Sequence, residues 1–239
     1  MSTYLRTAVA VSLFASLAAG TNAVASTSMS LHKLTATQIL NISLSAARAQ
    51  KSVDSLLTTS IFGLSAKVQT QSGVSSGRSL VNVNGHSGEV LEVNGTVFTK
   101  LDATMVNFEF HINAPSLANK WISVPRRSRY FSTVSTGITL ASVLEELTPA
   151  GALTQSITSY NGVRVVALSG RANSSVDLPG GTQILYVSTK APFLPVGGRV
   201  HLSATGVKLD LAVRITHWGV PLRISAPSTF TKISATTLR

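Results

Sequence analysis

The sequence predicts an α+β fold, in which one antiparallel β-sheet carries its helices on one face. Three observations lead to this prediction. At least eight short segments rich in β-branched residues are separated by Gly, Pro, Asn and Ser, two segments have the apolar spacing of amphipathic helices, and strands and helices do not alternate as in a parallel sheet. No repeat or linker interrupts the pattern, so we expect one domain over residues 35–239, after a short flexible segment at residues 26–34.

Residues 1–25 are typical of a secretory signal peptide. Arg6 precedes an apolar run from Ala8 to Gly20, and Ala23-Val24-Ala25 provides a small-x-small cleavage site. An uncleaved membrane anchor is the alternative, but the run is shorter than the roughly 20 apolar residues that a spanning helix needs. We therefore expect a protein that is exported and then secreted or held in the cell envelope.

Composition limits both the chemistry and the partners. The chain has no cysteine, which excludes disulfides, a thiol nucleophile, zinc thiolates and a lipidated cysteine. Lysine and arginine number 20 against 9 acidic residues, and loss of Arg6 with the signal peptide changes the net charge from +11 to 11 − 1 = +10. Such a charge favours anionic partners. Because the cations are scattered, apart from Arg126-Arg127-Ser128-Arg129, we expect an anionic membrane or cell-wall surface and no nucleic acid.

The first regular element is a helix. In residues 35–51, Thr35 and Gln38 match a capping box, and apolar residues follow at helical spacing. The outer face of this helix is polar, as expected of a helix that lies on a sheet. A first strand within residues 53–70 and a Ser/Gly-rich loop at residues 71–77 come next.

The clearest strand pairing lies in residues 78–101, a predicted β meander. Asn94-Gly95 tolerates the positive φ angles of a type I′ turn, and apolar runs flank it. Counting outward from the turn places Leu91 opposite Phe98 and Glu89 opposite Lys100 on one face. Neither face is cleanly polar, so we expect something to cover both sides of this hairpin.

After residue 101 the pattern weakens. Residues 105–112 are apolar without clean periodicity, and the sequence does not decide between helix and strand there. Residues 120–125 predict a short strand ended by proline, and residues 139–147 predict a short amphipathic helix. The remaining predicted strands are residues 153–158, 163–169, 182–189, 207–215 and 222–225.

The sequence offers little for catalysis or metal binding. Gly73-Val74-Ser75-Ser76-Gly77 has the letters of a nucleophile elbow, but a strand follows where that motif requires a helix, so hydrolysis at Ser75 is disfavoured. The five histidines lack metal-ligand spacing, and the adjacent Glu145 and Glu146 point in different directions on a helix. We therefore predict no enzyme activity, no metal and no cofactor.

Several segments, taken together, resemble one family. They are Ala46-Ala47-Arg48-Ala49 with Ser52-Val53, Val93 to Lys100, Asn119 to Pro125, Leu185 to Thr189 with Pro192 to Pro195, and Trp218 to Pro227, in the order found in that family. From Thr35 to Pro227 the chain resembles the actinobacterial LppX/LprG-type lipoproteins, relatives of the LolA/LolB lipoprotein carriers. It departs from them at Ala25 to Ser28, where such proteins carry the cysteine that is lipidated.

The resemblance implies a half-barrel, meaning a strongly curved antiparallel sheet whose concave face is covered by helices, with an apolar cavity for acyl chains between them. It also implies a carrier that binds lipids or glycolipids in the cell envelope. Each buried methylene would contribute about 0.8 kcal/mol, so binding would come from apolar burial. The alternative is a basic, cell-wall-associated interaction protein with the same fold and a filled core, and composition alone favours a filled core. We expect a monomer in either case.

Candidate cavity residues come from the hairpin and the short helix. We place Leu91, Val93 and Phe98 inside, although the opposite hairpin face is an open alternative. The other candidates for the lining are Val81, Val83, Leu101, Phe131, Leu140, Val143, Leu144, Leu185 and Val187. Arg126, Arg127 and Arg129 are candidates for contact with an anionic head group.

Overall fold

The computed structural model describes residues 31–61, 64–128, 130–172, 181–204 and 207–233. The helices are α1 (Ala36–Ala49), α2 (Ala103–Phe110), α3 (Phe131–Ser135) and α4 (Leu140–Leu147), with 3₁₀ turns η1 (Leu31–Lys33) and η2 (Pro115–Leu117). The strands are β1 (Ser52–Ile61), β2 (Leu64–Gly73), β3 (Ser76–Val83), β4 (His86–Val93), β5 (Thr96–Leu101), β6 (Ile122–Val124), β7 (Ala150–Tyr160), β8 (Val163–Arg171), β9 (Thr182–Ser188), β10 (Pro195–Ala204), β11 (Val207–Trp218) and β12 (Thr231–Lys232).

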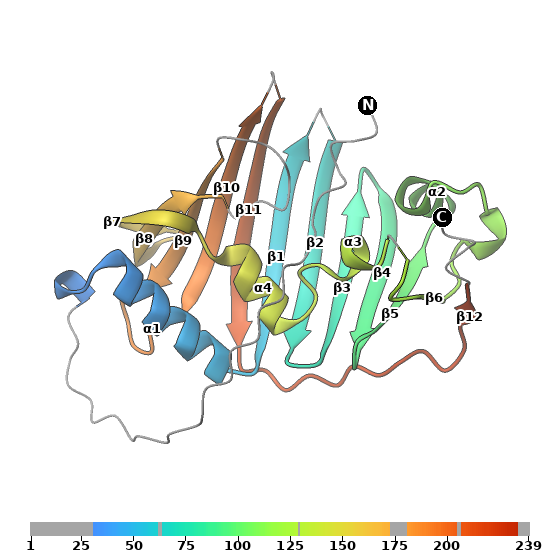
Figure 1. The fold of residues 1–239 in the computed structure, drawn as a ribbon, viewed down its shortest axis with the longest axis horizontal. Helices are drawn as coiled ribbons and strands as arrows, with labels where there is room; N and C mark the ends of the chain where they lie inside the picture. Colours follow the sequence, from blue (N-terminus) through green and yellow to red (C-terminus); the bar gives the residue numbers. More distant parts are fainter. Residues whose placement is uncertain (1–30, 62–63, 129, 173–180, 205–206, 234–239) are drawn as a thin grey trace.

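All of these strands belong to one 12-stranded sheet, in the order β12-β6-β5-β4-β3-β2-β1-β11-β10-β9-β8-β7. Neighbouring strands are antiparallel except β12 and β6, which are parallel. Figure 1 shows an open, curved sheet with α1, α4 and α3 lying across one face. The structure therefore confirms the predicted class, a curved antiparallel sheet with helices over its concave face.

Asn-Gly turns set the register of three hairpins. At Asn84-Gly85, Asn94-Gly95 and Asn161-Gly162, φ is 50–51° at the asparagine and 75–86° at the glycine. Positive φ at both central residues is the requirement of a type I′ turn, whose twist matches that of the flanking strands. Leu91 accordingly lies opposite Phe98, as predicted.

Both predicted helices form and are capped by threonine. The Gln38 N–H donates to Thr35 Oγ1 at 3.3 Å, and the Thr35 N–H donates to Gln38 Oε1 at 2.9 Å, which completes the capping box of α1. At α4, Thr139 Oγ1 accepts from the Ser142 N–H at 3.4 Å. These caps satisfy backbone donors that a helix start leaves without intrahelical partners.

The helices and the sheet enclose two separate apolar cores. The first lies under α1 and α4 and contains Leu31, Ile39, Leu40, Leu44, Ala47, Val53, Leu140, Val143, Leu144, Leu147, Val166, Leu168, Leu185 and Val187. The second lies under α2 and α3 and contains Val90, Val97, Leu101, Met105, Val106, Phe110, Ile122, Val124, Tyr130, Val134, Ile138 and Ile233. At the centre of the sheet, where β1, β2, β10 and β11 run, Val53 is the one described residue among the buried members of either core, although Val213, Ile215 and Trp218 of β11 pack against the first core.

The C-terminal segment covers part of the opposite face. After β11 the chain runs along the sheet to β12, at the far end (Figure 1). There the Phe230 ring meets the Phe98 ring edge to face, with centroids 5.0 Å apart, and Phe98 and Leu91 are buried. The expectation that both faces of this hairpin are covered is confirmed.

Other expectations were wrong about the element boundaries. The stretch 53–70 contains two strands, β1 and the start of β2, and the predicted loop 71–77 consists largely of the end of β2 and the start of β3. Strand β10 was missed because Pro195, Gly197 and Gly198 resemble turn residues. Residues 222–225 form no strand; they belong to the irregular C-terminal segment.

The undecided stretch 105–112 lies mostly in α2. Asp102 caps this helix, because its Oδ1 accepts from the Met105 N–H at 2.8 Å and its Oδ2 accepts from the Ser87 N–H at 2.8 Å. Burial alone would raise the pKa of Asp102, but these hydrogen bonds and the nearby His86 together hold it below its usual value. The helix is therefore fixed at its start by a residue just outside the ambiguous apolar run.

Residues 1–30 and Arg129 lie outside the described residues, so the predicted signal peptide, most of the segment 26–34 and one candidate head-group arginine are not tested. Among the described residues, no helix has both the length and the apolar character needed to cross a bilayer.

Candidate ligand cavity

A cavity of about 250 Å³ lies between α4 and the centre of the sheet, in the seam between the two cores. Its lining residues are Ser55, Leu57, Val68, Thr70, Ser79, Thr136, Gly137, Val143, Glu146, Leu147, Gln183, Ile184, Gly198, Arg199, Val200, Leu211 and Val213. They come from six strands, from α4 and from the link between α3 and α4. Apolar side chains make up much of the wall, which is the composition expected of a ligand pocket.

Strand register explains the composition of the cavity floor. Directly opposed residues share a face of the sheet, so Val213, Leu57 and Val68 form an apolar row across β11, β1 and β2. The neighbouring row on the same face is Ser55, Thr70 and Ser79 across β1, β2 and β3. The floor is thus apolar in one row and lined by hydroxyl groups in the next.

Helix α4 forms the roof, and glycine on the sheet makes space for it. A β-carbon added at Gly198 would lie 3.2 Å from Leu147 Cδ2 and 2.9 Å from the Ile184 carbonyl oxygen. A β-carbon added at Gly77 would overlap the carbonyl oxygen of Ile138, in the link that precedes α4. Glycine at both sites therefore allows the roof to lie close to the sheet.

Among the residues that the structure describes, the lining has one carboxyl group, that of Glu146, and no cationic side chain that points inward. Burial raises the pKa of Glu146, and the adjacent Glu145 raises it further. The backbone carbonyl of Glu146 also accepts from Gln183 Nε2 at 2.6 Å, which ties the end of α4 to β9. Arg199 alternates with Gly198 and Val200 along β10, so its exposed side chain points to the opposite face of the sheet.

The buried hydroxyl groups of Thr70 and Ser79 form a pair on the cavity floor. Their oxygen atoms are 3.0 Å apart, and the two residues are only 6% and 5% exposed. One hydroxyl donates to the other, which leaves the second hydroxyl with its own proton to donate. No other side-chain hydrogen bond engages this pair within the described part of the chain.

The structure brings only part of the predicted lining to the cavity. Val143 lines it directly, while Leu140, Leu144, Leu185 and Val187 lie in the adjoining first core. Val81, Val83, Leu101 and Phe131 belong to the second core or pack against it.

The structure places the three hairpin candidates, Leu91, Val93 and Phe98, on the face of the sheet opposite the cavity. Thr70 lies opposite Ser79, and Ser79 lies opposite Val90, so Val90 shares the cavity face of the sheet. Leu91, its neighbour along β4, therefore points to the other face, as does Phe98 opposite it. Val93, two residues from Leu91, is also on that far side. These three residues point away from α4, while Val90 and Val97 on the opposite face lie in the second core, so the described lining of the cavity includes no residue from either face of this hairpin.

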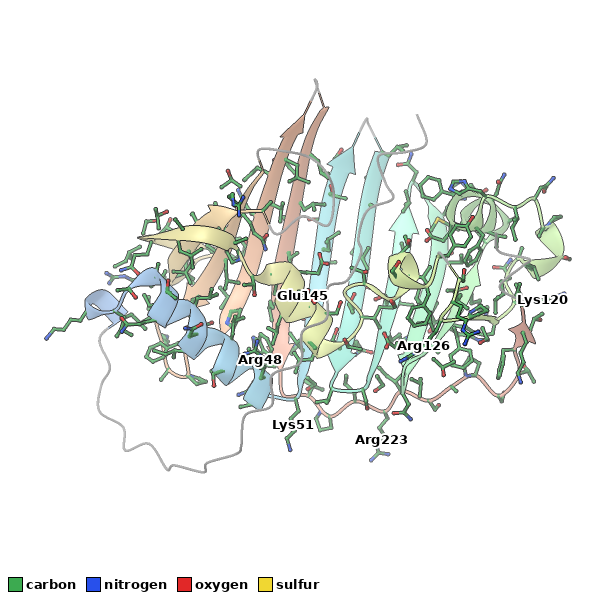
Figure 2. The ribbon with its side chains drawn as sticks, viewed as in Figure 1. Arg48, Lys51, Lys120, Arg126, Glu145 and Arg223 are labelled. Carbon is green, nitrogen blue, oxygen red and sulfur yellow. The ribbon has the colours of Figure 1, made fainter. Side chains whose placement is uncertain are left out.

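Two of the candidate head-group arginines, Arg126 and Arg127, are described by the structure, and neither lines the cavity. Arg126 Nε donates to the Gly95 carbonyl oxygen at 2.9 Å, and its guanidinium lies 5.8 Å from the Phe131 ring centroid. Burial raises the pKa of Glu92, and the positive charge of Arg126 partly offsets this rise. Figure 2 shows Arg126 over a different part of the sheet from Glu145 of α4. Arg127 is exposed and is not among the lining residues.

Sequence reasoning missed most of the apolar floor. Leu57, Val68, Val200, Leu211 and Val213 all line the cavity. The alternation in LSAKV at residues 64–68 and LDLAV at residues 209–213 identifies which side chains share a face. This alternation does not reveal which face of the sheet the helices cover only in part.

A second hollow of about 540 Å³ lies on the opposite face and is more polar. Its lining includes Asp54, Gln69, Arg78, Arg214 and His217. Arg78 Nε is held by Glu89 Oε1 at 2.7 Å.

The described residues show no group of three or more His, Asp or Glu side chains placed to hold a metal ion. Ser75 lies in the turn between β2 and β3, and a strand follows it, which agrees with the doubt about a nucleophile elbow. Three histidines each lie beside a single aspartate: His86 Nδ1 is 3.3 Å from Asp102 Oδ2, His217 Nδ1 is 3.6 Å from Asp54 Oδ2, and His201 contacts Asp210.

No family profile and no curated protein sequence matches the chain. Three solved structures are similar to parts of it. An uncharacterized conserved protein from Thermus thermophilus has 13% sequence identity and a TM-score of 0.45, over 83% of this chain and 99% of that chain. A DUF1329 family protein from Desulfovibrio piger has 10% identity and a TM-score of 0.34 (80% and 95% of the two chains), and a LolA superfamily protein from Nitrosomonas europaea has 13% identity and a TM-score of 0.31 (83% and 98%). TM-scores this low carry no argument about function. The fold assignment rests on the strand order and the placement of the helices.

Proposed function

We propose that the protein binds a lipid by burying part of an acyl chain in the cavity beneath α4. The observation that carries this proposal is the cavity itself, an apolar space of about 250 Å³ between two filled cores. An apolar cavity of about 150 Å³ accommodates benzene, and pockets for drug-sized ligands begin at about 300 Å³. The space therefore suits one segment of an acyl chain.

The wider role that we propose is that of a lipid or glycolipid carrier of the LppX/LprG type, exported and secreted or retained in the cell envelope. The segment 1–25, the motifs shared from Thr35 to Pro227 and the curved sheet with its helices are the support for it. Binding requires no reaction, and we propose that the protein is not an enzyme and acts as a monomer.

We further propose an anionic membrane or cell-wall surface as the partner of one rim of the sheet. Arg48 lies in the last turn of α1 and Lys51 follows the helix, both exposed, and exposed Arg223 lies on the C-terminal segment (Figure 2). Ser52 Oγ donates to the Val220 carbonyl oxygen at 2.6 Å, which holds that segment beside Lys51. Val220 is itself 39% exposed, so the rim combines cations with apolar surface, the combination that favours interfacial membrane binding.

The decisive experiment measures bound lipid. Protein purified without detergent from an actinobacterial host is extracted with organic solvent, and the extract and the intact protein are examined by mass spectrometry. We expect about one lipid per protein. Protein that is free of lipid and takes up none from mixed micelles would refute the proposal and favour the alternative, a basic interaction protein without a ligand.

The rim is tested by cosedimentation with vesicles. Each cation near an anionic surface contributes about 1 kcal/mol, so replacing Arg48, Lys51 and Arg223 by Gln should weaken binding to phosphatidylglycerol vesicles by up to roughly a hundredfold. Phosphatidylcholine vesicles provide the uncharged comparison. Equal binding of the variant and the wild type to anionic vesicles would rule out this rim as the contact.

A further inference from the structure

We infer that the cavity selects a ligand with an uncharged polar group, such as an ester or a hydroxyl, and that Thr70 and Ser79 hold this group against the floor. The inference rests on the proposed lipid binding and names the chemical class that the same cavity takes. Its basis is the placement of buried hydroxyl groups beside an apolar row, and the absence of an inward cation among the described lining residues.

The two hydroxyl groups are built into the wall. Thr70 and Ser79 lie directly opposite each other on β2 and β3, and each is more than nine-tenths buried. Their mutual hydrogen bond of 3.0 Å uses one donor, so one hydroxyl proton and several lone pairs remain. A buried donor without an acceptor is costly, and a ligand oxygen in the cavity would satisfy it.

The position of the pair fixes where the polar group sits. Ser55 continues the same row on β1, and Leu57 and Val68 lie one row away, toward the ends of β1 and β2 that no helix covers (Figure 1). An acyl chain would lie along the apolar row, and its polar group would reach the hydroxyl row under α4. The pair can both donate to and accept from a ligand, which suits an ester or hydroxyl group.

The charges around the cavity exclude an anionic head group from this position. Glu146 is the carboxyl group among the lining residues, and Arg199 points to the other face. Arg126 is engaged at Gly95, beside the second core. A phosphate or carboxylate placed against Thr70 would therefore meet no inward cation of the described lining and would be repelled by Glu146 when that group is ionised.

The test compares three probes that share an 18-carbon chain: 1-monooleoylglycerol, oleate and 1-octadecene. Delipidated protein is incubated with each probe in mixed micelles and passed through gel filtration, and the bound probe is quantified by gas chromatography. The variant is Thr70→Val with Ser79→Ala, which removes both hydroxyl groups with little change of shape. Removing both partners of a buried hydrogen bond together has little effect on stability. The control is Thr58→Val, on the same sheet at an exposed position.

We expect the wild type to bind monooleoylglycerol at least fivefold more tightly than octadecene or oleate. The double variant should lose about fivefold to tenfold in affinity for monooleoylglycerol and bind octadecene as well as the wild type does, while Thr58→Val changes neither. Equal binding of monooleoylglycerol and octadecene by the wild type, or an unchanged preference in the double variant, would overturn the inference and leave lipid binding intact. Failure of all three probes to bind would instead refute the proposed function.

Discussion

Replacing Val68 by Phe should block most of the cavity. By proportion to the cavity of about 150 Å³ that holds the six carbons of benzene, 250 Å³ accommodates about ten ligand carbons. Phenylalanine adds four carbons to the valine side chain, so about four ligand carbons would be displaced. At about 0.8 kcal/mol per methylene, the loss is about 3 kcal/mol, or about two hundredfold in Kd. This figure is an upper limit, because Val68 is half-buried and the ring can turn partly toward solvent.

The assay is the same gel-filtration measurement of bound monooleoylglycerol and octadecene. Val68→Phe should weaken the binding of both probes, because the displaced volume is apolar. Removal of the hydroxyl pair should weaken the binding of monooleoylglycerol alone. Val163→Phe is the matched control, because Val163 is 43% exposed on β8 and does not line the cavity. Urea unfolding checks that both variants remain folded.

Undiminished binding of both probes by folded Val68→Phe would refute the placement of the acyl chain along the apolar row of the cavity floor. In that case the lipid would have to lie elsewhere on the sheet, and the hydroxyl row would lose its role as well.

Three further predictions concern the framework that holds the cavity. Gly77→Ala should lower the free energy of unfolding by about 1–3 kcal/mol, because the new β-carbon overlaps the Ile138 carbonyl oxygen, and urea denaturation measures it. Asp102→Asn keeps the side-chain oxygen that caps α2 but removes the carboxyl group, whose pKa is held below its usual value. Stability from the ionised carboxylate is present above about pH 4 and is lost as the pH falls through the folded-state pKa, so the wild type should lose more stability than the variant between pH 6 and pH 2. Arg126→Ala should destabilise the protein by about 1 kcal/mol at pH 7 and by less at pH 4, where Glu92, with its raised pKa, is largely protonated; equal losses at both pH values would show that the pair does not interact.

The parts of the fold that the sequence predicted correctly are those with a local cause. The Asn94-Gly95 turn sets the register of its hairpin through the φ angles of two residues, and Thr35 with Gln38 caps α1 within one helical turn. Strand β10 was missed because Pro195 and Gly198 are unfavourable in isolated strands. Gly198 is tolerated there because Leu147 of α4 packs over it, a contact between residues about fifty positions apart in the chain.

The face of the hairpin could not be chosen from local sequence either. Both faces of β4 and β5 carry apolar side chains, and both are covered in the structure. The choice depends on which cover is larger: α2 and α3 pack on Val97, while Phe230 from the far end of the chain packs on Phe98. Alternation thus predicted correctly which residues pair across the hairpin. Which face of the sheet each pair lies on depends on contacts that only the folded chain reveals.

The cavity itself has a cause in side-chain size that bears on function. At the centre of the concave face the sheet presents Ser55, Thr70, Ser79 and Gly198, where the flanking cores present leucine, isoleucine and phenylalanine. If it were fully enclosed, a space of about 250 Å³ would cost up to about 6 kcal/mol relative to a filled core; this cavity is partly open, and access of solvent reduces the cost. Larger apolar residues at these positions would recover much of that stability. A wall-binding scaffold would gain from filling the space, whereas a lipid carrier needs it to stay open, and the small residues at the centre of the sheet therefore favour the carrier.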